Sequence, residues 1–63
     1  MDGMRFFIEW TDNFEGWDYS ENVSTNELLD RQLDDTLTIT FVGMVDANGN
    51  VGEDLPDLHK IVL

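Results

Sequence analysis

The sequence predicts a small α+β domain, in which an antiparallel sheet of three to four strands carries one short helix packed on a face. Residues 4–10 and 36–46 alternate apolar and other residues, as strands do. Residues 25–34 follow a helix-capping pattern, and Asn48-Gly49 is typical of a tight hairpin. With 63 residues, the whole chain is expected to form one small acidic domain with a marginal core.

The first strand is expected to bury an aromatic and aliphatic face. Phe6, Ile8 and Trp10 occupy every second position and therefore fall on one side of the strand. Phe7 falls on the other side, which indicates that the second face is partly covered as well.

Residues 11–22 are expected to form an irregular segment with at most one helical turn. A glycine and two asparagines favour a loop. Trp10, Phe14 and Trp17, however, are spaced four and three residues apart, as on one face of a helix. We expect Trp10 and Phe14 to lie in the core. Trp17 fits either the core or, with Tyr19, an anchor for a partner protein.

The helix is expected to begin after Ser24. This residue is a good N-cap, and Glu27 completes a capping box with it. Leu28, Leu29 and Leu33 then supply an apolar face.

In the second predicted strand, Leu37, Ile39 and Phe41 point to one face, and Gly43 is a candidate bulge. The Asn48-Gly49 turn that follows would need positive φ at both positions. A returning strand is expected near residues 50–51. Residues 59–63 are expected to form a last strand or to continue the hairpin after a break.

The composition is strongly acidic, with 14 Asp and Glu against three Lys and Arg, a formal charge of −11 and a pI near 4.1. Such a charge bears on partners and solubility. The 41% apolar residues argue against disorder. The N-terminus lacks a secretory pattern, and the apolar run at residues 41–45 is too short to span a bilayer. A soluble, cytoplasmic protein is expected.

Acids recur at every third residue from 9 to 21, and no Lys or Arg occurs between residues 6 and 30. A row of carboxylates can imitate a row of phosphates, although a solvated loop explains the same pattern. Evenly spread, the net charge is roughly one unit per 380 Å², against about one per 110 Å² on duplex DNA. Only a polarised molecule would therefore resemble DNA. The residues expected to bind a partner are Glu9, Asp12, Glu15, Asp18, Glu21, Asp30, Asp34, Asp35, Glu53 and Asp54.

No catalytic or metal site is expected. Residues 46–50 resemble the start of a calcium loop, but Val51 replaces the required glycine, and the hairpin turn explains these residues better. Glu53, with the aspartates beside it, could form a carboxylate pair only in a cleft, for which so small a chain has little room. His59 has no nearby Ser, Cys or second His. We therefore expect no enzyme and no cofactor.

The small size, the heavy acidity and the retained aromatic residues together resemble the DNA-mimic inhibitors encoded by phages, among them anti-CRISPR and antirestriction proteins. The resemblance covers the overall profile and no motif. It implies an inhibitor that binds the basic nucleic-acid-binding groove of a target, such as a subunit of a CRISPR effector, and blocks DNA binding. Direct contact with nucleic acid or membrane is not expected, and a monomer is favoured.

Two other classes of function stay open. Proteins of extreme halophiles also replace lysine with acid, and a general interaction module can carry an acidic patch for a basic protein without any link to nucleic acid. An acyl carrier protein is small and acidic too, but the Asp-Ser-Leu motif that it needs is absent.

Overall fold

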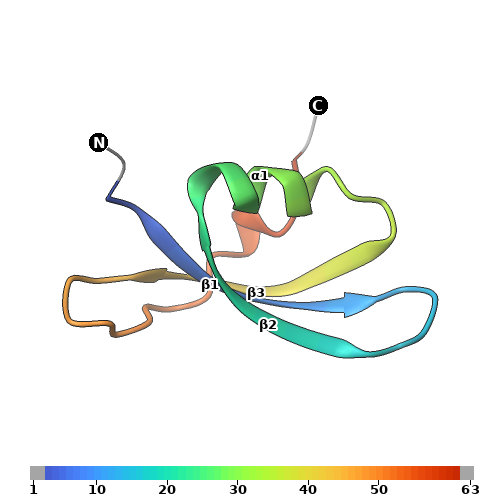
Figure 1. The fold of residues 1–63 in the computed structure, drawn as a ribbon, viewed down its shortest axis with the longest axis horizontal. Coiled ribbons are helices and arrows are strands. Elements are labelled where there is room, and N and C mark those ends of the chain that lie inside the picture. The colour runs from blue at the N-terminus through green and yellow to red at the C-terminus, as the bar shows by residue number, and fades with distance from the viewer. Residues whose placement is uncertain (1–2, 62–63) are drawn as a thin grey trace.

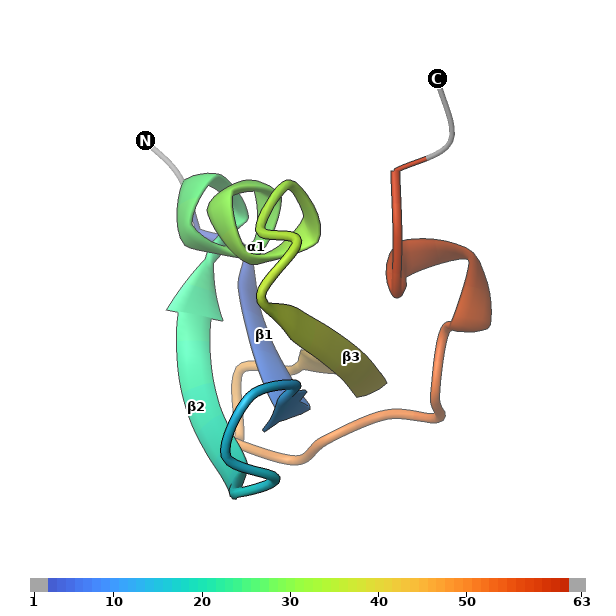
Figure 2. The ribbon, with the colours of Figure 1, turned by 90° about the vertical axis from the view of Figure 1, so that its right-hand side faces the viewer.

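The computed structural model describes residues 3–61 and consists of a three-stranded antiparallel sheet with one helix on a face (Figure 1). The strand order is β2-β1-β3. Figure 2 shows α1 on one side of the sheet and a short 3₁₀ helix beside β3. The predicted α+β class is confirmed. The elements are β1 (Arg5–Asp12), β2 (Asp18–Ser24), α1 (Thr25–Gln32), β3 (Leu37–Val45) and η1 (Pro56–Leu58).

The core lies between α1 and the sheet. The alternation predicted for the first strand is confirmed, because Phe6 and Ile8 are buried and Trp10 packs, partly buried, against them. Phe7 lies on the opposite face, where its ring meets Phe41 edge to face at a centroid distance of 6.2 Å. The buried side chains are Phe6, Ile8, Val23, Leu28, Ile39 and Val42.

The strand predicted at 36–46 exists, but its alternation breaks at Thr40. This residue is an extra one in β3, placed between two positions that pair with consecutive residues of β1. As a result Ile39 and Val42, three residues apart, are both buried. Phe41 turns to the other face, so the expectation that it shares a face with Ile39 is wrong. Gly43 is not the site of the bulge.

The expectation of an irregular segment at residues 11–22 is wrong, because these residues form parts of two strands and the turn between them. β1 continues through Asp12, a turn covers residues 13–17, and β2 begins at Asp18. The second strand is hard to recognise in the sequence because its inward positions are Tyr19, Glu21 and Val23, of which only Val23 is buried. An acid at an inward position hides the period-two pattern.

The predicted helix is confirmed, together with its capping box. Ser24 accepts a hydrogen bond from the Glu27 amide at 3.2 Å, and the Glu27 carboxylate accepts one from the Ser24 amide at 2.8 Å. The helix ends at Gln32, two residues earlier than expected. Only Leu28 is buried, whereas Leu29 and Leu33 stay 43% and 57% exposed.

The turn after β3 is held by an acid and not by two residues with positive φ. The Asp46 carboxylate accepts hydrogen bonds from the amides of Asn48 and Asn50, both at 2.9 Å. Only Gly49 has positive φ in this turn. The expected returning strand is reduced to a single bridge between Val45 and Val51.

Residues 51–55, here called the strap, run along the outer edge of β3. The Gly52 amide donates to the Met44 carbonyl at 2.8 Å, and the Leu55 amide donates to the Val42 carbonyl at 2.8 Å. The Asp54 carboxylate accepts from the Val42 amide at 2.9 Å. The strap thus satisfies backbone groups that an edge strand would otherwise leave open.

The last predicted strand, at 59–63, is wrong for residues 59–61, which have no strand pairing; residues 62 and 63 lie outside the described part. Instead, η1 brings Leu58 against the core. The Gln32 side chain ties α1 to this segment by donating to the Leu58 carbonyl at 2.7 Å.

Candidate partner-binding surface

Five of the ten acids predicted to bind a partner gather at one end of the molecule. The β1–β2 turn and the connection from α1 to β3 lie at the same end of its longest axis (Figure 1). The Asn13 amide of the turn donates to the Thr36 carbonyl of the connection at 2.9 Å, and the Thr38 hydroxyl, near the start of β3, donates to the Asn13 side chain at 2.8 Å. The acidic end consists of Asp12, Glu15, Asp18, Asp34 and Asp35.

The turn at this end is tightly held. The Asp12 carboxylate accepts from the amides of Phe14 and Glu15 at 2.8 and 3.2 Å. The Asp12 amide donates to the Trp17 carbonyl and the Gly16 amide to the Asp12 carbonyl, both at 2.8 Å. Gly16 has a φ of 78°, which a residue with a side chain rarely adopts. The conformation of residues 12–17 is therefore fixed by the chain itself.

The same turn displays aromatic side chains to solvent. Phe14 is 82% exposed and Trp17 is 63% exposed, so the expectation that Phe14 lies in the core is wrong. Tyr19 stacks on Trp10 with a centroid distance of 4.5 Å and leaves 45% of its surface exposed. Exposed aromatic side chains of this size are a common mark of interaction surfaces.

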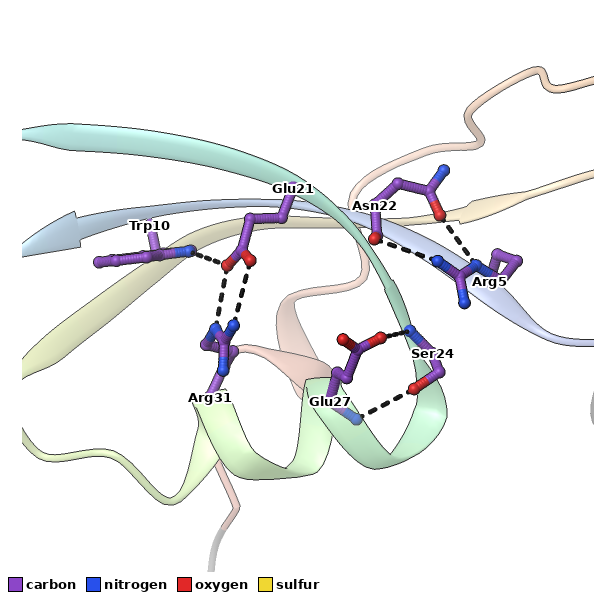
Figure 3. Close-up of polar contacts among 7 residues, drawn as sticks. All are labelled: Arg5, Trp10, Glu21, Asn22, Ser24, Glu27 and Arg31. Atoms are coloured by element: carbon purple, nitrogen blue, oxygen red, sulfur yellow. Dashed lines mark hydrogen bonds and ion pairs between the residues drawn. The ribbon is translucent and has the colours of Figure 1, made fainter.

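Glu21 does not belong to the acidic end. Its carboxylate accepts two hydrogen bonds from the Arg31 guanidinium, at 2.9 and 3.0 Å, and one from the Trp10 indole at 2.7 Å (Figure 3). The Arg31 hydrogen bond is the main cause that lowers the pKa of Glu21, and the same contact raises the pKa of Arg31. This carboxylate therefore ties α1 to the sheet and is not free for a partner.

The other four predicted residues lie apart from these five. Glu9 is exposed on the sheet face opposite α1, and Asp30 is exposed on α1. Glu53 and Asp54 belong to the strap. The Asp54 carboxylate lies 2.7 Å from the His59 ring, a contact that lowers the pKa of Asp54. The predicted set is therefore divided among several surfaces.

Within the acidic end, the five carboxylates differ in how freely they can bind. Asp12 holds the turn, Asp18 accepts from the Thr11 hydroxyl at 2.7 Å, and Asp34 accepts from the amide and hydroxyl of Thr36. The Thr36 hydroxyl is the main cause that lowers the pKa of Asp34. Glu15 and Asp35 have no side-chain hydrogen bond or ion pair within residues 3–61.

Within the described part of the chain, no cation forms an ion pair with a carboxylate of the acidic end. Arg31 pairs with Glu21, and Arg5 donates to the side chain and carbonyl of Asn22 at 3.0 and 3.2 Å (Figure 3). Lys60 makes no ion pair among the described residues. The carboxylates therefore keep their charge toward solvent.

A cleft of about 340 Å³ adjoins the acidic end. It is lined by the acids Asp34 and Asp35, by the cations Arg31 and Lys60, and by the His59 ring. Opposite charges therefore partly offset one another at the cleft, whereas the charged side chains at residues 12–18 are all acidic. Among residues 3–61, no group of three or more His, Cys, Asp or Glu side chains is placed to hold a metal ion.

Sequence reasoning missed two parts of this surface. The exposure of Phe14 was hidden because its spacing from Trp10 and Trp17 imitates a helical face. The basic lining of the cleft arises only when η1 brings His59 and Lys60 beside α1. A turn signal was present at Gly16, and reading it as a hairpin would have placed Phe14 outward.

No described helix is both long and apolar enough to cross a membrane. In comparisons with known proteins, the chain matches no family model, no curated protein and no solved structure.

Proposed function

We propose that this protein is an acidic inhibitor that occupies the positively charged nucleic-acid-binding groove of another protein. The observation that carries the proposal is the acidic end, where five carboxylates gather without an ion pair to Lys or Arg in the described chain. A protein that binds nucleic acid presents Lys and Arg to phosphates, and these contacts supply much of its affinity. Carboxylates held in a fixed arrangement can use the same contacts.

The net charge of −11 supports the same proposal through the rate of encounter. A field of one sign steers an oppositely charged surface toward the molecule and speeds association. The overall profile of this protein indicates a target that is a component of a bacterial defence system, such as a CRISPR effector subunit. The inhibitor then acts as a monomer in the cytoplasm of the host. This narrower identity depends on the resemblance to phage DNA mimics.

The test uses the immobilised protein and a bacterial lysate at low salt, with DNA as the eluting competitor. Two double variants distinguish an effect of charge at the acidic end from an effect of the total charge of the molecule. Glu15→Lys with Asp35→Lys changes the acidic end, whereas Glu53→Lys with Asp57→Lys changes the strap and η1 by the same amount of charge. We expect the first pair to weaken binding of the DNA-eluted protein by roughly tenfold or more and the second pair to have a much smaller effect.

Two outcomes of this experiment would contradict the proposal. Equal losses for both pairs would mean that only total charge matters, which contradicts the proposal. Bound proteins that salt releases but DNA does not would indicate a general acidic interaction module. Circular dichroism of both variants, which leave the structural acids in place, checks that the fold is kept.

A further inference from the structure

The β1–β2 turn combines two features that the proposed function uses only in part. Along residues 12–18, acids and aromatic side chains alternate, and each ring stands between two acids in the sequence. Both rings are exposed to solvent, while the backbone between them is fixed by hydrogen bonds. The alternating residues are Asp12, Phe14, Glu15, Trp17 and Asp18.

A preorganised turn makes these rings effective anchors. Binding has to immobilise side chains, and the cost is smaller where the backbone is already ordered. Aromatic side chains that enter a recess of the partner are frequent hot spots of protein interfaces. The acids on either side require that the recess lie within a basic surface, because like charges would oppose docking.

A groove for duplex DNA does not offer such a recess. In a duplex the bases are stacked inside, and proteins contact phosphates and the edges of bases. A site for single-stranded nucleic acid, in contrast, combines Lys and Arg along the backbone path with aromatic platforms on which bases stack face to face. Rings that alternate with negative groups have the chemistry of such a strand.

We infer that residues 12–18 occupy a site for single-stranded or unstacked nucleotides on the partner protein. Phe14 and Trp17 take base-stacking positions, and the carboxylates of Glu15 and Asp18 take phosphate positions. The inference rests on the proposed function and narrows it to a class of target site.

The first test compares competitors against the immobilised protein with its captured partner. A short oligothymidine strand and a duplex with the same number of phosphates are titrated in parallel. We expect the single strand to release the partner at a concentration at least tenfold lower than the duplex. Release by the duplex at an equal or lower concentration would overturn the inference, because the site would then be one for duplex DNA.

The second test removes the rings. Phe14→Ala with Trp17→Ala is expected to weaken partner binding at least tenfold and to make the remaining binding more sensitive to salt. Leu29→Ala with Leu33→Ala is the matched control, because it removes exposed apolar side chains from α1 and from the residue that follows it and should leave affinity within twofold of the original. Phe14→Tyr with Trp17→Phe keeps a ring at each position and should retain most of the binding, which separates stacking from a folding defect.

The two proposals fail in different ways. If Glu15→Lys with Asp35→Lys abolishes binding while the double alanine variant binds as the original does, the nucleotide-like role of the rings is wrong and the acidic inhibitor stands. If neither change affects binding, the proposed function itself is wrong.

Discussion

Glu21 has a structural role, although it continues the row of acids that predicts a partner-binding surface. It occupies an inward position of β2, where its two oxygens face Arg31 of α1 and the indole of Trp10 (Figure 3). The two side chains of the ion pair are only about one-third exposed, at 31% for Glu21 and 30% for Arg31. Solvent therefore screens this pair less than a surface pair.

Replacing Glu21 with Gln should lower the free energy of unfolding at pH 7 by about 1–2 kcal/mol. The pKa of Glu21 is below its ordinary value of 4.5 in the folded protein. Its contribution is therefore complete above this value and is lost as pH falls through the lower, folded pKa. Urea unfolding at neutral and acid pH should show a difference between the original protein and the variant that shrinks on acidification. Glu9→Gln, at an exposed position, is the control; an unchanged difference at low pH would contradict this role.

Several acids owe their positions to turn chemistry. Asp12, Asp34 and Asp46 each accept a hydrogen bond from the backbone amide two residues further on. The amide of Asn50 is the main cause that lowers the pKa of Asp46. Part of the acidity is therefore explained by local structure. The charge left for a partner resides mainly in Glu15 and Asp35 and in the second carboxylate oxygens of Asp18 and of the turn aspartates.

At the scale of elements, the sequence was most informative where a signal is local. The capping box of Ser24 and Glu27 needs only four residues, and it correctly located the start of α1. The sequence does not reveal β2, because its inward positions include Glu21, whose carboxylate pairs with Arg31 from another element. The bulge at Thr40 and the strap depend on pairing between distant segments, for which the chain carries no local pattern.

The candidate surface, like the secondary-structure elements, can be predicted from the sequence where the signal is local and not where it depends on contacts between distant segments. The acids were identified by their spacing, and the turn brought three of them together near two more from the α1–β3 connection. The separation of Glu21 and Asp54 from this group follows from contacts with Arg31 and His59. Such contacts join residues of different segments, so spacing alone does not reveal them.

The strap and β3 approach each other closely at Gly43. A Cβ at this position would lie 2.7 Å from the Val51 side chain and 2.8 Å from the Gly52 carbonyl oxygen. Gly43→Ala should therefore lower the free energy of unfolding by about 1–3 kcal/mol, measured by urea unfolding. Gly52→Ala is the matched control, since its nearest neighbour would be at an ordinary 3.6 Å. Equal stability of both variants would mean that the strap does not pack against β3.

At the scale of the whole molecule, charge and shape are linked. The principal extents are 35 × 25 × 18 Å, and the turns at residues 13–17 and 46–50 lie at opposite ends of the longest axis (Figure 1). The acidic end therefore lies at the opposite end of the molecule from the turn at residues 46–50. Under the proposed function, the acidic end would enter the basic groove of the target while the opposite end would stay outside it.

The same charge predicts how the fold responds to salt. The screening length falls from about 30 Å at 0.01 M salt to about 10 Å at 0.1 M, so carboxylates repel one another across the whole molecule only in dilute buffer. The single Arg–Glu pair of the described chain responds in the opposite direction, but its side chains are only about one-third exposed, so salt weakens it little. Repulsion should therefore dominate, and stability should rise with salt.

We expect cooperative thermal unfolding already in dilute buffer, with a Tm that rises by about 4–8 °C, the equivalent of roughly 1 kcal/mol for a domain of this size, between 0.01 and about 0.3 M salt. The rise should then level off, because further salt has little repulsion left to screen. Calorimetry or circular dichroism at stepped sodium chloride measures this. A chain that stays unfolded until molar salt would instead match halophile adaptation, in which the acids serve solvation. A Tm that falls with salt would show that attraction, and not repulsion, dominates the folded state.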